Sequence, residues 1–308
     1  MQLRALGAAA LTAGALVLAA TVPANASTVA PAGDGSCLTA GTSARGYDGH
    51  GADTRSISAA EQARIEKQTT QRLAQRGTTR RQAAATGASV PVYVHVMAAK
   101  NGAGNVTDSQ ITQQIAVLNK TYAGGESGSA ANTGFTFYLA GANRYYNDTW
   151  HRDGSSTKYR SQTRQGGANA LNIWLVDFSY LGIATFPWDY AKNPKIDGIR
   201  VQYSSLPGGS ATNYNYGKTA THEAGHWFGL YHTFQGGCSA PGDEVTDTPR
   251  EREPTSGCPD DGTKNTCPAG DVDPIHNFMD YAIDSCMWEF TPGQSARMDM
   301  MWSTYRAP

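Results

Sequence analysis

Residues 222–232 of this 308-residue chain read HEAGHWFGLYH, which has the residue types and the spacing of a hydrolytic metal site. His222 and His226 lie four residues apart, so a helix places both imidazoles on one face. Gly229 can adopt the left-handed conformation that ends a helix, and the resulting turn can bring His232 to the same metal. Three such ligands predict a catalytic zinc ion whose fourth position stays open to water.

Glu223 directly follows the first of these histidines. In this pattern the glutamate accepts a proton from the water instead of binding the metal. The alternative is a surface helix that is rich in histidine by chance, but such a helix has no reason to carry a glycine turn and a third histidine at this spacing. We therefore predict zinc-dependent hydrolysis with Glu223 as the general base.

The sequence also indicates the elements that must position these residues. Helical spacing, capping signals or the histidine motif predict helices over 58–75, 107–122 and 216–228, and regular structure of unspecified type is expected again near 294–305. Runs of β-branched and aromatic residues predict strands over 90–97, 135–139, 171–178, 182–186 and 199–203. We expect 171–178 at the centre of a sheet and 182–186 at its edge, because Pro187 stops that strand. From about residue 234 to 293, Gly, Pro, Asp and Cys predict irregular structure.

The full motif H-E-x-x-H-x-x-G-x-x-H, with a methionine-containing segment downstream at Asn277–Tyr281, is that of metzincin peptidases. Thr219–Cys238, Gly242–Pro249 and Asn277–Tyr281 resemble the pappalysin (cytophagalysin) family of metzincins, in a match over about residues 90–305. Thr233 argues against an astacin-type member, which has Glu there. The resemblance implies an α+β fold: a metzincin-like zincin catalytic domain with a twisted mixed sheet, an active-site helix and an irregular, disulfide-stapled C-terminal subdomain. It also implies a zinc metalloendopeptidase.

The resemblance assigns roles to two residues of the downstream segment. Met279 would form the hydrophobic floor beneath the metal, and Tyr281 would direct its phenol at the oxyanion of the tetrahedral intermediate. A core methionine and a packing tyrosine are the alternatives. The strand over 182–186 would bind extended substrate by strand addition.

Acidic residues indicate two further features. Asp284 lies where the family carries acidic residues associated with a preference for arginine after the scissile bond, but Ser285 occupies a second position where an acid is expected. A loop rich in oxygen ligands could hold calcium, although a solvated acidic loop is the alternative. Its candidate ligands are Asp243, Asp247 and Thr248, with Glu251 and Glu253 nearby.

Four of the five cysteines lie in the irregular region, where an oxidising compartment would let them pair. The sequence alone permits three pairings, and the resemblance implies Cys238–Cys267 with Cys258–Cys286. Cys37 then has no partner. Because a thiolate is a strong zinc ligand, we expect Cys37 to cap the metal and to keep a precursor inactive. The sequence around it matches the family's signature only in part, and a free or intermolecularly paired thiol is the alternative.

The N-terminal region predicts secretion and processing. Residues 1–26 have the features of a signal peptide: a positive start, an apolar stretch over about 5–22 and the small residues Ala24-Asn25-Ala26. A membrane anchor is the alternative. Residues 27–81 then form a propeptide that contains the polar helix over 58–75. This helix has too few apolar residues for a core, so we expect it to lean on another surface. Arg80-Arg81 is a candidate cleavage site before a catalytic domain over 82–308.

The net charge of −1 gives no reason to expect nucleic acid or an anionic membrane as a partner. The expected partner is a protein or peptide substrate. We expect the mature protein to be an extracellular monomer that is not bound to a membrane. A secreted binding protein that keeps the fold without turnover is the main rival. Intact Glu223 favours the enzyme, because a degenerate member could lose it without structural cost.

Overall fold

The computed structural model describes residues 42–46, 57–77, 79, 87–267 and 272–308, which all belong to one compact unit over Gly35–Pro308. The predicted signal peptide, Cys37 and Arg80-Arg81 lie outside the described residues. Among the helices that are described, none combines the length and the apolar character needed to cross a membrane.

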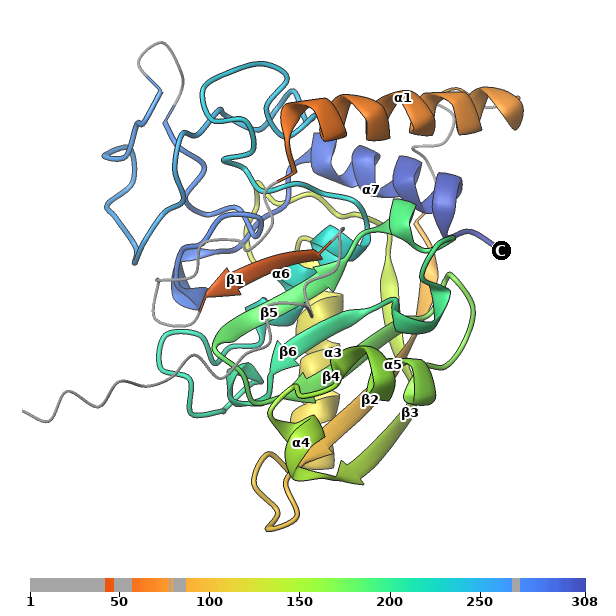
Figure 1. The fold of residues 1–308 in the computed structure, drawn as a ribbon. Helices are drawn as coiled ribbons and strands as arrows, with labels where there is room; N and C mark the ends of the chain where they lie inside the picture. The colour runs from red at the N-terminus through yellow and green to blue at the C-terminus, as the bar shows by residue number, and fades with distance from the viewer. Residues whose placement is uncertain (1–41, 47–56, 78, 80–86, 268–271) are drawn as a thin grey trace, which may run out of the picture. The chain divides into compact units, whose positions relative to one another are not determined.

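A mixed six-stranded sheet has the order β1-β5-β6-β4-β2-β3 (Figure 1). Its strands are β1 (Thr42–Gly46), β2 (Ser89–Ala98), β3 (Thr136–Tyr146), β4 (Leu171–Val176), β5 (Tyr180–Thr185) and β6 (Ile199–Gln202). β3, β2, β4 and β6 run parallel to one another, whereas β5 pairs antiparallel with both β6 and β1.

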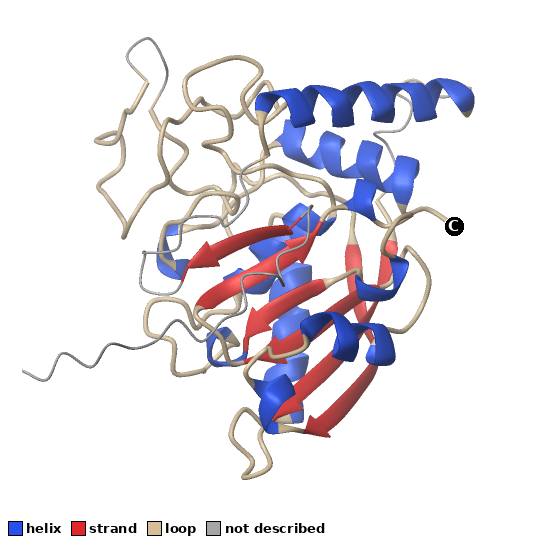
Figure 2. Ribbon diagram, viewed as in Figure 1, coloured by secondary structure: helices blue, strands red, loops and turns tan. Residues whose placement is uncertain are grey.

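Three helices, α1, α3 and α6, fall close to their predicted positions, α7 occupies the segment where regular structure was expected to resume, and α4 and α5 were not predicted (Figure 2). They are α1 (Ala59–Gln75), α3 (Asp108–Tyr122), α4 (Asp148–His151), α5 (Ser156–Thr163), α6 (Lys218–Trp227) and α7 (Pro292–Tyr305). Short 3-10 helices are η3 (Pro187–Asp189), η4 (Pro194–Ile196), η5 (Tyr203–Ser205) and η6 (Asp284–Cys286). At the start of α3, the Thr107 hydroxyl accepts a hydrogen bond from the Gln110 backbone and the Gln110 side chain accepts one from Thr107, which fixes this end.

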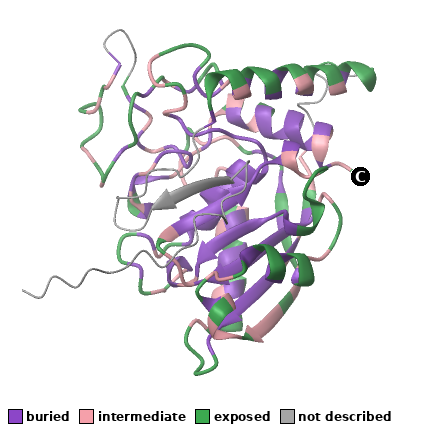
Figure 3. Ribbon diagram, in the orientation of Figure 1, coloured by how far each residue is buried: buried purple, intermediate pink, exposed green. Residues whose placement is uncertain are grey.

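β4 is buried along its whole length, as expected for a central strand (Figure 3). Leu171, Ile173 and Leu175 join the main core, which α3 and α6 complete. Trp174 and Val176 point to the opposite face and pack with Tyr159 of α5. Because both faces are covered, the strand reads as a continuous apolar run without alternation.

β3 is longer than the predicted 135–139. It pairs with β2 as far as Tyr146, with a register shift opposite Val92/Tyr93. Most of its residues are exposed or half-buried, since β3 is the outer strand beside β2. The strand therefore lacks the apolar run that identifies the others.

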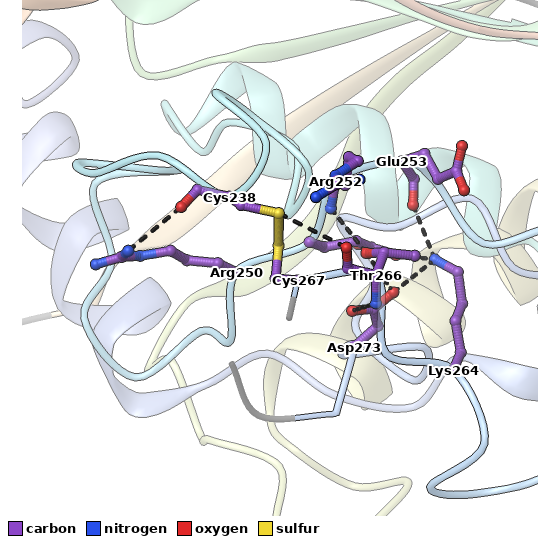
Figure 4. The surroundings of a disulfide bond; sticks show 9 residues. Cys238, Arg250, Arg252, Glu253, Lys264, Thr266, Cys267 and Asp273 are labelled. Atoms are coloured by element: carbon purple, nitrogen blue, oxygen red, sulfur yellow. Dashed lines mark hydrogen bonds and ion pairs between the residues drawn. A yellow bond between two sulfur atoms is a disulfide. The ribbon is translucent and has the colours of Figure 1, made fainter. Parts of the chain in front are cut away.

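Two disulfides staple the irregular region after His232, and they join Cys238 to Cys267 and Cys258 to Cys286, the crossed pairing that the resemblance implies. Figure 4 shows the first of them. There the Cys238 carbonyl accepts a hydrogen bond from Arg250, while Thr266 accepts one from the Arg252 backbone. Local hydrogen bonds and covalent links thus replace the regular core that this region lacks.

Candidate metal centre and active site

Helix α6 and the turn after it bring three histidines together. His222 and His226 lie one helical turn apart on α6, and Gly229 (φ 99°) reverses the chain so that His232 returns to them. The Nε2 atoms are 3.1 Å apart for His222 and His226, 3.0 Å for His226 and His232, and 3.3 Å for His222 and His232. All three side chains are buried.

The hydrogen bonds of these rings show that a cation fits between them. Nδ1 of His222 lies 2.6 Å from the Phe278 carbonyl oxygen, and Nδ1 of His226 lies 2.9 Å from that of Leu230. A carbonyl oxygen can only accept, so each Nδ1 carries the proton and each Nε2 presents a lone pair. Lone pairs directed at one another at this distance repel unless a cation lies between them. Zn–N bonds of about 2.0–2.1 Å in a tetrahedral site separate ligand atoms by about 3.3–3.4 Å, close to the observed spacing.

Glu223 is fully buried on α6 and faces strand β5. A Cβ placed on Gly182 of β5 would lie 2.4 Å from Oε1 of Glu223 and 2.5 Å from its Cδ. The carboxylate therefore fills the space that a side chain at Gly182 would need. Glu223, the predicted general base, therefore lies next to the first histidine and against β5, the strand that was expected to bind substrate.

The methionine segment closes the site from the other side. Met279 is fully buried, and its Sδ lies so close to α6 that a Cβ on Gly225 would be 2.4 Å from it. The Tyr281 ring centroid lies 5.7 Å from that of His222 and 4.9 Å from that of His232. The structure thus brings both predicted residues to the three histidines.

A buried polar network connects the third histidine to the methionine segment. The Thr233 hydroxyl donates to Glu251 (2.7 Å), which also accepts from the Thr255 hydroxyl (3.2 Å) and from Lys264. The Thr255 backbone N–H in turn donates to Asp280 (2.9 Å). Burial, and then the charge of Asp280, raises the pKa of Glu251, and burial raises the pKa of Asp280.

Glu251 was expected only as one acid of a calcium loop, and the structure instead gives it this supporting role. Its partner Thr233 lies 18 residues away, and its other contacts include Lys264. The sequence holds no local pattern that could have identified the network.

The three calcium candidates have different surroundings. Asp247 is exposed, and its oxygens accept from the Thr291 hydroxyl (2.7 Å) and the Gly293 N–H (2.8 Å), at the start of α7. Oδ1 of Asp243 accepts from Val245, while its Oδ2 and the Thr248 hydroxyl are buried and interact with each other. Burial raises the pKa of Asp243 to about 7. Asp243 and Thr248 are therefore the better candidates for a cation.

Asp284 is fully buried, and it anchors the start of the active-site helix. Its Oδ2 accepts hydrogen bonds from the backbone N–H groups of Tyr216 (2.9 Å) and Lys218 (3.4 Å). A carboxylate at a helix N-terminus is favourable for the helix dipole, so this residue contributes to the position of α6.

The prediction that 182–186 forms an edge strand is wrong for the full chain. β1 pairs antiparallel with β5, with Ala44 opposite Ile183 and Arg45 opposite Gly182. β1 belongs to the predicted propeptide. A segment of the propeptide therefore pairs with the edge of β5 that was expected to bind substrate. Sequence patterns missed β1 because a short strand that pairs far along the chain has no local signature.

The fold and the site define a metzincin-like metalloprotease. Residues 178–302 match the peptidase M43 family described as pregnancy-associated plasma protein-A. An "Extracellular metalloprotease 1" from Coccidioides posadasii is 45% identical over 225 residues, which cover 71% of this chain and 78% of that protein. An extracellular metalloprotease from Colletotrichum graminicola is 43% identical over 233 residues, which cover 73% and 80%.

Solved structures give the same result. Mirolysin in complex with compound 9 has a TM-score of 0.63 at 31% identity and covers 70% of this chain and 91% of that one. A promirolysin mutant from Tannerella forsythia has a TM-score of 0.66 at 26% identity and covers 82% and 94%. The chain belongs to the pregnancy-associated plasma protein-A family of metalloproteases and is a metalloendopeptidase.

Proposed function

We propose that this chain is the latent precursor of a secreted zinc endopeptidase. The observation that carries the proposal is the position of Glu223 beside three converging imidazoles and against strand β5. The names of the extracellular relatives support secretion, and the likeness to promirolysin supports a precursor. Residues 1–26 would be the signal peptide, 27–81 the propeptide and 82–308 the catalytic domain.

His222, His226 and His232 would hold the zinc ion, since their unprotonated Nε2 atoms converge. Zinc bound there supplies a Lewis acid that polarises the scissile carbonyl and lowers the pKa of a water molecule. Glu223 accepts the proton of the attacking water and passes it to the leaving amine. Tyr281 donates a hydrogen bond to the oxyanion, which its place beside His222 and His232 supports.

Substrate would add to β5 once β1 has left, with its backbone hydrogen-bonded to the exposed strand. Until then β1 blocks that strand, and we propose that Cys37 occupies the open position of the metal. Cleavage near Arg80-Arg81 would precede release. Because β1 would still cover β5, we expect a Cys37→Ser precursor to gain only partial activity, on short peptides, before processing. Full latency of that variant would argue against the switch.

The neighbouring buried oxygens of Asp243 and Thr248 are the feature that favours a calcium ion as a second, structural cofactor, with Asp247 at most a peripheral ligand. Selective calcium chelation with zinc retained should lower the melting temperature, and an unchanged temperature contradicts the site. The resemblance alone suggests a preference for arginine after the scissile bond, since Asp284 is buried against the start of α6. A peptide library tests this preference, and cleavage that is equally frequent before all residue types would exclude it.

Casein digestion tests the enzymatic proposal. The processed wild type should cleave casein, and o-phenanthroline should abolish the cleavage. Glu223→Ala should lose nearly all activity, and Tyr281→Phe should lose on the order of 10²-fold in kcat, as for removal of an oxyanion donor. Glu253→Ala is the matched control because Glu253 is exposed.

Folded wild-type protein that binds zinc but leaves casein and a peptide library intact would instead be the silent binding protein. Equal activity of Glu223→Ala and wild type would also overturn the assignment of the general base.

A further inference from the structure

The surface of the catalytic domain beneath α1 borders the three histidines, since the Phe186 ring lies 5.4 Å from that of His226, but it has a chemistry of its own. Its apolar part, together with Ile65 and Leu73 of α1, forms one buried cluster. We call this surface the α1 site, and define it by the apolar residues Phe186, Trp188, Tyr231, Met300 and Met301 with the charged residue Arg297.

Arg297 gives the α1 site a buried positive charge. Its guanidinium lies 2.7 Å from the Glu66 carboxylate of α1, and both side chains are less than one-tenth exposed (3% and 9%). The Nε–H of Arg297 donates to the Gly229 carbonyl (3.0 Å), in the turn that returns His232, and the guanidinium stacks over Tyr231 (4.7 Å). Loss of one partner from a buried ion pair is strongly unfavourable, so α1 has a specific reason to remain bound.

Further polar contacts fix the register of α1. Gln62 donates to the Gly242 carbonyl (2.9 Å) and to Glu244 (3.1 Å). The Thr69 hydroxyl lies 2.8 Å from that of Tyr305. The buried residues of α1 follow helical spacing along one face: Gln62, Ile65, Glu66, Thr69 and Leu73.

We infer that the α1 site is a second attachment point for the propeptide, which uses neither pairing with the substrate strand nor a bond to the metal, and that it recognises an amphipathic helix with one buried carboxylate. Its occupant is the segment 57–77 of this chain, which stays bound after the chain is cut between residues 77 and 87. The inference rests on the proposed processing of the precursor. Cutting the chain and releasing the propeptide are then two separate steps.

The test uses the full chain with Glu223→Ala and Cys37→Ser, so that neither self-digestion nor the proposed cysteine switch contributes. A specific protease cuts a site placed within 80–86, and size-exclusion chromatography with mass spectrometry then measures how fast the N-terminal fragment leaves. We expect the fragment to co-elute with the catalytic domain. Glu66→Gln should accelerate its release at least about tenfold, because Arg297 loses its charged partner.

Glu61→Gln is the matched control, since Glu61 lies on the same helix, is partly exposed and forms a long ion pair with Arg64 of that helix (3.6 Å). It should change the release rate less than about twofold. Thr69→Ala is a second, milder variant that should accelerate release without disturbing the fold. Melting curves of the uncut chains establish that each variant is folded.

Immediate dissociation of the wild-type fragment overturns the inference, as does equal release from Glu66→Gln and Glu61→Gln. If Glu66→Gln fails to fold, the comparison of Thr69→Ala with wild type decides in the same way. Because the readout is binding, a lack of proteolytic activity would refute the proposed function without touching this result.

Discussion

Gly182 lies where the predicted general base and the substrate strand meet. Since a Cβ at this position would be 2.3 Å from Cγ of Glu223, any side chain must displace the carboxylate or the strand. Main-chain pairing of β5 with β6 fixes the strand, whereas the Glu223 side chain can rotate. The absence of a side chain at Gly182 therefore positions the base.

We predict that Gly182→Ala lowers kcat by about 10- to 100-fold, since displacement of a reacting group by about 1 Å can cost two orders of magnitude. The zinc content, measured by elemental analysis, should stay at the wild-type level because the three histidines are not displaced. Gly128→Ala is the control, as its added methyl group meets nothing within 4 Å. A kcat equal to wild type would show that Glu223 does not need this space.

At the scale of elements, the parts of the site that could be predicted are those whose geometry is local. His222 and His226 share a helix turn, and Gly229 follows at once, so spacing alone defined α6 and the turn. The capping residues of α3 likewise identify its start without any tertiary contact. Such features depend on neighbouring residues, and a sequence displays them directly.

Features formed by distant segments could not be predicted in this way. The pairing of β1 with β5, and the contacts of Glu251 with Thr233 and Thr255, depend on where the chain returns after long irregular stretches. Resemblance to a family supplied the disulfides and Tyr281, but not the ion pair between Glu66 and Arg297. Residue spacing thus reveals the metal ligands and the general base, but not the strand pairing, hydrogen bonds and ion pair that hold them in position.

The polar network of Glu251 and Asp280 predicts a pH-dependent stability. Burial raises the pKa of both carboxyl groups above their ordinary values of 4.5 and 3.8, so the folded chain binds protons more tightly than the unfolded chain. The free energy of unfolding contributed by this pair is therefore fully present below about pH 4. It is lost as the pH rises through the raised pKa values.

We predict that Glu251→Gln flattens this fall by on the order of 1–2 kcal/mol between pH 5 and 8, one pKa unit being about 1.4 kcal/mol. Urea unfolding of the Glu223→Ala chain at several pH values measures the slope without self-digestion. Glu253→Gln is the control and should leave the slope unchanged, because Glu253 is exposed. Parallel slopes for Glu251→Gln and its parent would assign the pH dependence to other groups.

At the scale of the whole molecule, contacts around the turn after α6 hold the parts of the chain together. The metal would join α6 to the chain after Gly229, Arg297 of α7 donates a hydrogen bond to the Gly229 carbonyl, and α7 packs against α1 of the predicted propeptide. In the precursor, α1 and β1 contact both the sheet side and α7. The predicted propeptide therefore stabilises the fold at the same positions where it blocks the site.

The metal connection leads to a prediction about stability that does not depend on catalysis. Without a cation, the Nε2 lone pairs of His222 and His226 face each other at 3.1 Å, with His232 Nε2 at 3.0–3.3 Å from both, in a buried space, which disfavours the folded state. Zinc at a thousandfold excess over its Kd would stabilise the folded chain by about 4 kcal/mol. For a domain of this size that corresponds to about 8–16 °C in the melting temperature.

Calorimetry of the Glu223→Ala chain with zinc, and again after chelation, should show this difference. His222→Gln should lose most of the zinc-dependent shift, because it removes a ligand that lies on α6. His276→Gln should keep the shift, since His276 hydrogen-bonds to the Cys286 carbonyl and Asp261, away from the three histidines. Equal melting temperatures with and without zinc would mean that the metal does not connect α6 to the turn, and that protein contacts alone hold the active site together.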